Sequence, residues 1–310
     1  MPIATLNEAL VYYRKFSTAV LNRSPSTIRN TEVAIRQLLN FLGVDPHPAE
    51  IQRETMIDFL SWLRKKPKWE GHPGNHPKGK LTDISVNTYF RALRAFFNWL
   101  VREKIIPASP IDGLPAPSIE DKLPSHLPFD QARKLVRSID INSPAGSRDK
   151  AIILVILDTA LRAGELTSLQ LNHLDIESRD LMVTRRKVRR QQLLSFHQAT
   201  AAALAIYTLR RRPESVYGEL FLTLDGRPLT TDRLAKILYQ RGQAAGIHVN
   251  PQLLRHTAAI LKRRLEGWDA ERIQNLLGHS TGYMTRHYIR AAGDEDLREA
   301  FRKPGWVDKI

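Results

Sequence analysis

The sequence predicts a mainly α-helical protein with a small β-sheet in its C-terminal half, arranged as two domains. Apolar residues recur at helical spacing along most of the chain, whereas strand-like alternation is confined to residues 181–196. A segment with six prolines, residues 107–128, separates the two parts. The 310 residues are enough for each part to bury a core of its own.

The charge of the chain indicates its partner. The formal net charge is +15, and such a surplus attracts polyanions, so we expect nucleic acid rather than a membrane surface. The sequence has no cysteine, which excludes disulfides, thiolate nucleophiles and thiolate-bound zinc. It has no apolar run of about 20 residues, and charged Glu8, Arg14 and Lys15 argue against a signal peptide. We therefore expect a cytoplasmic protein.

Residues 1–106 are predicted to form a small helical domain. The expected helices run through residues 6–20, from an N-cap at Ser26 to a stop at Gly43, from Glu54 to Lys66, and from Ser85 to Lys104. The last is rich in aromatic residues at helical spacing, which favours core packing over base stacking. The polar segment 66–80 is expected to be a solvated or DNA-proximal loop. Zinc binding by its histidines is a minor alternative, since no carboxylate or thiolate spacing supports it.

Residues 107–128 are predicted to be a semi-rigid linker, because six prolines exclude a continuous helix. Two lobes joined by such a linker can close around a duplex from opposite sides.

Residues 129–310 are predicted to form a second domain. The expected helices cover residues 130–137, 150–161, 163–173, 198–211, 230–245, 251–265 and 269–277, the last ending at Gly278. Between them, the alternation at Leu181 and Val183 and again at Leu194 and Phe196 predicts a hairpin.

Four residues of this second domain suggest phosphoryl chemistry. Arg162 and Arg255 are followed by His279 in a Leu-Gly-His stretch and by Tyr288 nine residues later. Arginine binds phosphate oxygens bidentately, and a tyrosine hydroxyl can attack phosphorus. Each residue alone has an ordinary structural explanation, but the ordered set on a basic chain indicates a protein that cuts and rejoins a nucleic-acid backbone.

These segments resemble the tyrosine recombinases of the phage-integrase and Xer type. The stretch Thr159-Ala160-Leu161-Arg162-Ala163-Gly164-Glu165-Leu166 matches the family pattern Thr-Gly-Leu-Arg-x-x-Glu-Leu, with alanine for glycine at its second position. The resemblance implies that Arg162 and Arg255 hold the phosphate, that Glu165 is a buried support, that His279 donates to a non-bridging oxygen, and that Tyr288 is the nucleophile. It also implies a SAM-like, core DNA-binding N-terminal domain before a catalytic domain.

Lys187 lies in a run of five cations within residues 185–190. Such a run is usually a solvated face or a phosphate-contacting patch. The family places a catalytic lysine in a β-turn about eight residues before a proline or small residue, and Lys187 and Ser195 fit that offset. The resemblance therefore implies that Lys187 protonates the leaving 5′ oxygen.

The chain departs from the family pattern His-x-x-Arg-His at its first position, where Gln252 stands. Glutamine can hydrogen-bond to a phosphoryl oxygen but does not transfer a proton near neutral pH. His256 matches the final histidine, which packs beneath the site in the family. We expect the change at Gln252 to slow the reaction without abolishing it.

The resemblance implies a site-specific recombinase, or integrase, that acts through a 3′-phosphotyrosine and strand exchange, with no metal or nucleotide cofactor. Its partners are double-stranded DNA with defined sites and further copies of the chain, as a dimer on one site and a tetramer in the synapse. An accessory protein is left open. Residues 296–301 form a short amphipathic segment that packs on its own domain or docks on a neighbouring protomer. A bacterial, archaeal or phage origin and a simple Xer-like or mobile-element role are expected.

Three rival functions are kept beside this prediction. A catalytically impaired DNA-binding protein on the same scaffold would explain Gln252. A type IB topoisomerase would share the chemistry but relax DNA without pairing sites. A basic helical transcription factor or chromatin protein would form no covalent adduct with DNA.

Overall fold

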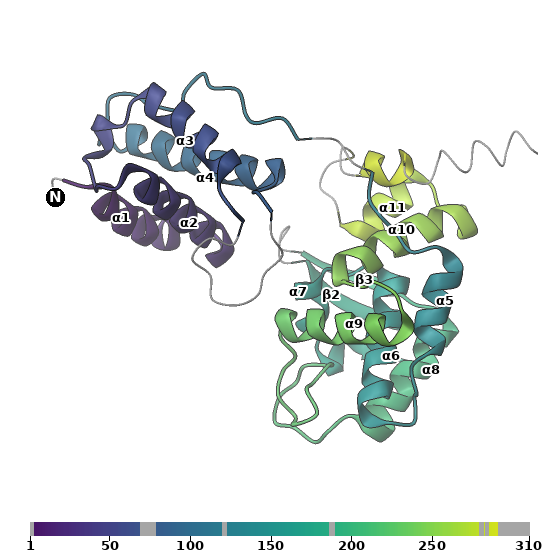
Figure 1. Cartoon of the computed structure of the whole chain (residues 1–310). Coiled ribbons are helices and arrows are strands. Elements are labelled where there is room, and N and C mark those ends of the chain that lie inside the picture. Colours follow the sequence, from purple (N-terminus) through teal and green to yellow (C-terminus); the bar gives the residue numbers. More distant parts are fainter. Residues whose placement is uncertain are drawn as a thin grey trace, which may run out of the picture. The chain divides into compact units, whose positions relative to one another are not determined.

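The computed structural model describes residues 3–68, 79–119, 123–185, 190–278, 282 and 285–290 (Figure 1). The chain divides into two compact units, Met1–Asp121 and Lys122–Ile310. The described parts of both units are mainly helical, and the described strands form one sheet in the second unit. The predicted fold class is therefore confirmed. None of the helices in these ranges has the length and apolar character of a bilayer-spanning segment.

The N-terminal unit is a helical bundle. Its helices are α1 (Leu6–Ala19), α2 (Pro25–Leu42), α3 (Arg53–Lys65) and α4 (Asp83–Arg102), with a 3-10 turn, η1 (Pro48–Glu50), before α3. The α4 aromatics Phe90, Phe96, Phe97 and Trp99 are buried. The ring of Tyr13, from α1, lies 5.3 Å from that of Phe96 and 5.0 Å from that of Trp99. Core packing of these aromatics, as predicted, is confirmed. Residues 69–78, most of the expected polar loop, lie outside the described part of the chain.

The ends of α2 follow local capping rules. The Ser24 hydroxyl accepts a hydrogen bond from the Thr27 amide at 3.2 Å, and Pro25 occupies the first helical position. The expected N-cap at Ser26 was wrong by two residues, because a proline that begins a helix moves the cap to the residue before it. Gly43 ends α2 in the left-handed conformation, with φ of 69°, as predicted.

The proline-rich segment 107–128 is anchored at both ends. Ile111 is buried in the core of the N-terminal unit, where the Asn87 side-chain amide also donates to the Pro117 carbonyl at 2.7 Å. Leu127 is buried in the core of the C-terminal unit. Residues 107–119 and 123–128 form no helix, as expected, but the apolar residues between the prolines still pack into the two cores.

The C-terminal unit surrounds a central helix. Its elements are α5 (Phe129–Arg137), α6 (Pro144–Thr159), α7 (Ala163–Thr167), η2 (Leu171–His173), β1 (Leu174–Asp175), β2 (Asp180–Arg185), β3 (Arg190–Ser195), α8 (Gln198–Ile206), η3 (Tyr207–Arg211), α9 (Thr231–Ala245), α10 (Pro251–Glu266) and α11 (Ala270–Leu277). Residues 285–290 are also helical. The sheet is antiparallel in the order β1-β2-β3. Helix α6 is buried along most of its length and packs against α8 and α10.

Three predicted elements differ from the structure. Helix α6 begins at Pro144 rather than Lys150, since Ser143 caps it. The single helix expected over 163–173 is broken, because the Leu171 amide leaves the helix to donate to the Gly218 carbonyl at 2.8 Å. The helix expected over 198–211 turns into a π-helical turn, η3, at residue 207.

Candidate active site

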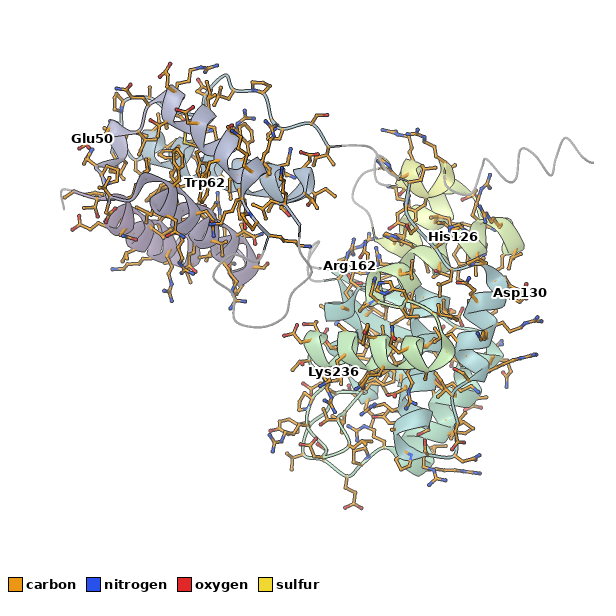
Figure 2. The ribbon with its side chains drawn as sticks, in the orientation of Figure 1. Glu50, Trp62, His126, Asp130, Arg162 and Lys236 are labelled. Carbon is orange, nitrogen blue, oxygen red and sulfur yellow. The ribbon has the colours of Figure 1, made fainter. Side chains whose placement is uncertain are left out.

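Arg162 lies at the N-terminal end of the short helix α7, just after α6 ends. The turn between the two helices depends on Ala160, which adopts the left-handed conformation with φ of 49°. Glu165 binds both the backbone and the side chain of Arg162. The Arg162 amide donates to Glu165 Oε2 at 2.9 Å, and the Arg162 guanidinium donates to Oε1 at 3.0 Å. The Arg162 side chain remains 31% exposed. Figure 2 shows it on the C-terminal unit. Arg162 is therefore fixed by a local contact while part of it reaches solvent.

Glu165 is a buried carboxylate between two arginines. Arg185, at the end of β2, donates to Glu165 Oε2 at 2.7 Å. Burial acts to raise the pKa of Glu165, but the charge of Arg185 and the hydrogen bonds and charge of Arg162 outweigh it and lower the pKa. Glu165 is thus an anion at neutral pH, and it accepts from both guanidinium groups.

Arg185 is a site residue that the sequence analysis missed. Its side chain is 1% exposed. A signal was present, because Leu181 and Val183 are buried in β2 and Arg185 continues the same alternation. The cationic run that begins at Arg185 obscures this signal, since a run of that kind predicts solvent exposure.

Arg255 is positioned by the start of α10. The Asn250 side chain caps this helix by accepting from the Leu253 amide at 2.9 Å. The buried Arg255 guanidinium donates to the Ala160 carbonyl and, at 2.7 Å, to the Leu277 carbonyl. Burial and the nearby charge of Arg162 lower the pKa of Arg255 to about 10, so the group is still a cation at neutral pH.

Tyr288 lies beside both arginines. It is buried against a small apolar cluster that includes Ala160 and residues of α10 and α11. Burial raises the pKa of the Tyr288 hydroxyl, while the charge and hydrogen bond of Arg255 and the charge of Arg162 oppose the rise without cancelling it. Arg255, on α10, and Arg162, at the start of α7, thus both act on the Tyr288 hydroxyl.

Gln252 and His256 form a pair next to Tyr288. The Gln252 Nε2 and His256 Nε2 atoms lie 2.7 Å apart, and the His256 ring stands edge-on to the Tyr288 ring at 5.3 Å. Burial lowers the pKa of His256, and the charge of Arg255 adds to this, against a hydrogen bond to the Ser125 backbone. His256 is therefore neutral at pH 7, and the amide of Gln252 donates to it.

Lys187 and His279 lie outside the described residues, as do residues 296–301. The structure does describe the residues at both ends of the hairpin segment that contains Lys187 and the residue before His279. Arg185 and Arg190 pair across the end of the β2–β3 hairpin, and Gly278 ends α11 in the left-handed conformation. Among the described residues, the structure thus brings together Arg162, Arg255 and Tyr288.

Two guanidinium groups and a phenol hydroxyl in one place are suited to a phosphodiester. The guanidinium groups can neutralise non-bridging oxygens, and the hydroxyl can attack phosphorus. Both arginines are held by acceptors of the protein, which orients them before any ligand arrives.

Comparison with known proteins identifies the family of the chain. The model of the phage integrase family matches residues 125–295, and the model of the phage integrase SAM-like domain matches residues 9–116. A curated relative, tyrosine recombinase XerC of Escherichia coli O127:H6 (strain E2348/69 / EPEC), is 33% identical over 278 residues, which cover 89% of each chain.

Two solved structures share the fold. The XerH site-specific recombinase bound to palindromic difH substrate, in a post-cleavage complex, aligns with a TM-score of 0.72 at 18% identity, covering 94% of this chain and 83% of that one. A lambda integrase tetramer bound to a Holliday junction aligns with a TM-score of 0.70 at 17% identity, covering 92% and 77%. With a family model matching more than half of its length, the chain belongs to the phage integrase family, the tyrosine-type site-specific DNA recombinases.

Proposed function

We propose that this chain cuts and rejoins double-stranded DNA at defined sites through a covalent bond between Tyr288 and a 3′ phosphate. The observation that carries the proposal is the convergence of two positive charges, those of Arg255 and Arg162, on the hydroxyl of the buried Tyr288. A buried tyrosine in an ordinary core does not need two converging cations, one of them itself buried.

In the proposed reaction, the Tyr288 hydroxyl loses its proton and its oxygen attacks phosphorus as the bond from phosphorus to the 5′ oxygen breaks. The 5′ oxygen gains a proton as it leaves, so the step conserves protons. Arg162 and Arg255 bind the non-bridging oxygens as negative charge builds up on them. We assign His279 to the same task and Lys187 to protonation of the 5′ oxygen, as the family motif implies. A 5′ hydroxyl from another strand then attacks the phosphotyrosine and exchanges the strands. The number of phosphodiester bonds is conserved, so no energy source is required.

The partners follow from the same chemistry. Strand exchange requires two sites and an active tyrosine at each exchanged strand, so we propose a dimer on each site and a tetramer in the synapse. The lambda integrase tetramer on a Holliday junction supports this assembly. We assign residues 1–106 to core-site binding, 107–128 to the linker and 129–310 to catalysis.

A nicked suicide substrate tests the proposal. It carries the cognate site, or a pool of candidate element ends, and a covalent protein–DNA adduct is sought on a denaturing gel. We expect the adduct from the wild type and none from Tyr288→Phe. Tyr207→Phe is the matched control, since it removes another buried tyrosine hydroxyl, one that accepts from the Leu222 amide.

The outcomes separate the rival functions. Salt-sensitive binding with no adduct from any variant would favour the DNA-binding protein on this scaffold. An adduct accompanied by relaxation of single-site plasmids, without exchange between two sites, would favour the topoisomerase.

A further inference from the structure

Arg185 is a buried cation whose donors reach three separate segments of the C-terminal unit. Its Nη1 donates to Glu165 Oε2 at 2.7 Å, its Nη2 to the Leu276 carbonyl at 2.6 Å, and its Nε to Gln192 Oε1 at 3.0 Å. The acceptors lie in α7, at the end of α11 and in β3. A guanidinium is a planar fork with donors on several sides, so it can hold three such segments in one fixed geometry.

Two of these segments, α7 and the end of α11, and the hairpin that contains Arg185 lead to groups assigned to the reaction. Glu165 binds both the amide and the guanidinium of Arg162. Leu276 lies three residues before His279, and Arg185 itself lies two residues before Lys187 in the hairpin. Arg185 therefore stands where the supports of three proposed site residues meet.

A second link strengthens the connection between the hairpin and α11. Gln192 accepts from Arg185 and donates through its Nε2 to the Asn275 carbonyl at 3.0 Å. Gly278, which ends α11, packs directly on Arg185, since a Cβ atom at this position would lie 3.1 Å from Arg185 Nε. The end of α11 is thus held by two side chains of the hairpin and fits closely against one of them.

Stability alone is a weak reason for such an arrangement. Two charges removed from water recover their desolvation cost only in good geometry, and apolar residues of similar size often stabilise a core at least as well. What an ion pair with a fixed fork adds is a defined orientation. At this position, the group that is oriented is Arg162, through Glu165.

We propose that Arg185 is a positioning residue, which fixes the Arg162 guanidinium through Glu165 and holds the end of α11 that leads to His279. The inference rests on the proposed function, because it concerns the rate of cleavage by Tyr288. Arg185 itself is buried behind Glu165 and is not assigned a contact with DNA.

The test compares Arg185→Met and Arg185→Lys with Arg148→Met. Arg148 is the matched control: it is also buried, is paired with Asp149 at 2.7 Å and donates to a backbone carbonyl, that of Leu222. Neither of these two partners is one of the described site residues. Adduct formation on the suicide substrate is measured in single turnover at saturating DNA, below the unfolding temperature of every variant. DNA affinity is measured in parallel.

We expect Arg185→Met to lower the rate by about tenfold or more, with DNA affinity changed by less than about threefold. Arg185→Lys should lie between this variant and the wild type, since it keeps the charge but loses the fork. Arg148→Met should keep the wild-type rate. In an Arg162→Lys background, adding Arg185→Met should lower the rate of adduct formation by less than about threefold. The further loss is small because the residue that Arg185 positions has already been replaced.

Equal rate losses in the Arg185→Met and Arg148→Met variants would overturn the inference, as would full additivity with Arg162→Lys. Wild-type rates in both Arg185 variants would do the same while leaving the proposed function intact. The absence of a wild-type adduct would reject the proposed function, and the positioning role with it.

Discussion

Gln252 is the residue at which this chain departs from its family motif. Its amide bonds to His256, whose ring contacts that of Tyr288. We expect Gln252→His to raise the rate of adduct formation by about tenfold or more, because an imidazole at this position can exchange a proton near neutral pH. The measurement is the single-turnover rate between pH 6 and pH 8.

Gln252→Asn is the control for this change, since it keeps the amide but shortens its reach to His256. It should not raise the rate. A rate that stays unchanged or falls in Gln252→His would show that the site is adapted to the amide, and that proton transfer at this position does not limit cleavage.

His256 links the stability of the C-terminal unit to pH. Its folded-state pKa lies below its ordinary value, mainly because of burial. The unfolded chain therefore takes up a proton at a higher pH than the folded one. The stabilising contribution of neutral His256 is complete above about pH 6.5, the ordinary histidine value, and is lost as pH falls through the folded-state pKa.

We expect the free energy of unfolding of wild type relative to His256→Gln to be constant from pH 8 to pH 7 and to shrink towards pH 5.5. Denaturant titrations of the two proteins give this difference directly, and the other titrating groups cancel in the comparison. A difference that stays constant down to pH 5.5 would contradict neutral burial of His256.

At the residue scale, the sequence predicts the groups that we propose bind the phosphate better than the groups that support them. Arg162, Arg255 and Tyr288 stand in ordered motifs, so pattern alone singles them out. No motif singles out Arg185, because its role depends on hydrogen bonds to Glu165 and Leu276, which are distant from Arg185 in the sequence. The charge of an arginine is visible in a sequence, but its burial depends on the whole fold.

At the scale of elements, Gly278 shows how a helix end contributes to the site. It ends α11 in the left-handed conformation and leaves room for Arg185. We expect Gly278→Ala to cost about 1–3 kcal/mol of stability, from backbone strain and the close approach to Arg185, and to slow adduct formation. Thermal unfolding and the suicide-substrate rate measure the two effects.

Gly267 provides a matched comparison at the end of α10. It has the same left-handed conformation, with φ of 69°, but among the described residues no atom beyond its chain neighbours lies within 4 Å of where its Cβ would be. Gly267→Ala should cost about 1 kcal/mol from strain alone and leave the cleavage rate unchanged. Equal rate effects of the two substitutions would argue against a role for the α11 end in positioning the site.

Helix existence was predictable from the spacing of apolar residues, whereas several boundaries were not. Prolines at 25 and 144 begin α2 and α6, and the expected starts at Ser26 and Lys150 missed that signal. The break after α7 had no local signal, since it depends on a hydrogen bond from Leu171 to Gly218. Local chemistry sets caps, but long-range pairing decides where a helix gives way to a strand.

At the scale of the molecule, charge controls the encounter with DNA. With a net charge of +15, binding should release counterions from the phosphates. We expect the affinity for a cognate duplex to fall by about tenfold or more between about 50 and about 200 mM monovalent salt. Fluorescence anisotropy with a labelled duplex measures this. Tyr288→Phe should keep the same slope, because it removes no charge, and an affinity independent of salt would contradict phosphate binding.

The two units have separate cores, which makes their contributions separable. Leu127 and residues of α5 to α10 form one core, whereas the helices of the N-terminal unit form another. We therefore expect residues 123–310 alone to unfold cooperatively and to bind the same duplex with a shallower salt dependence. The slope should fall by about 0.9 for every phosphate that only the N-terminal unit neutralises.

The two possible failures of this last experiment have different meanings. A fragment that does not fold would show that the C-terminal core depends on the N-terminal unit. A folded fragment with the full salt slope would show that the N-terminal unit neutralises no phosphates, which would remove the reason for two lobes to close around a duplex. A shallower slope with a cooperative transition would assign part of the electrostatic binding to each unit and show that the second unit folds by itself.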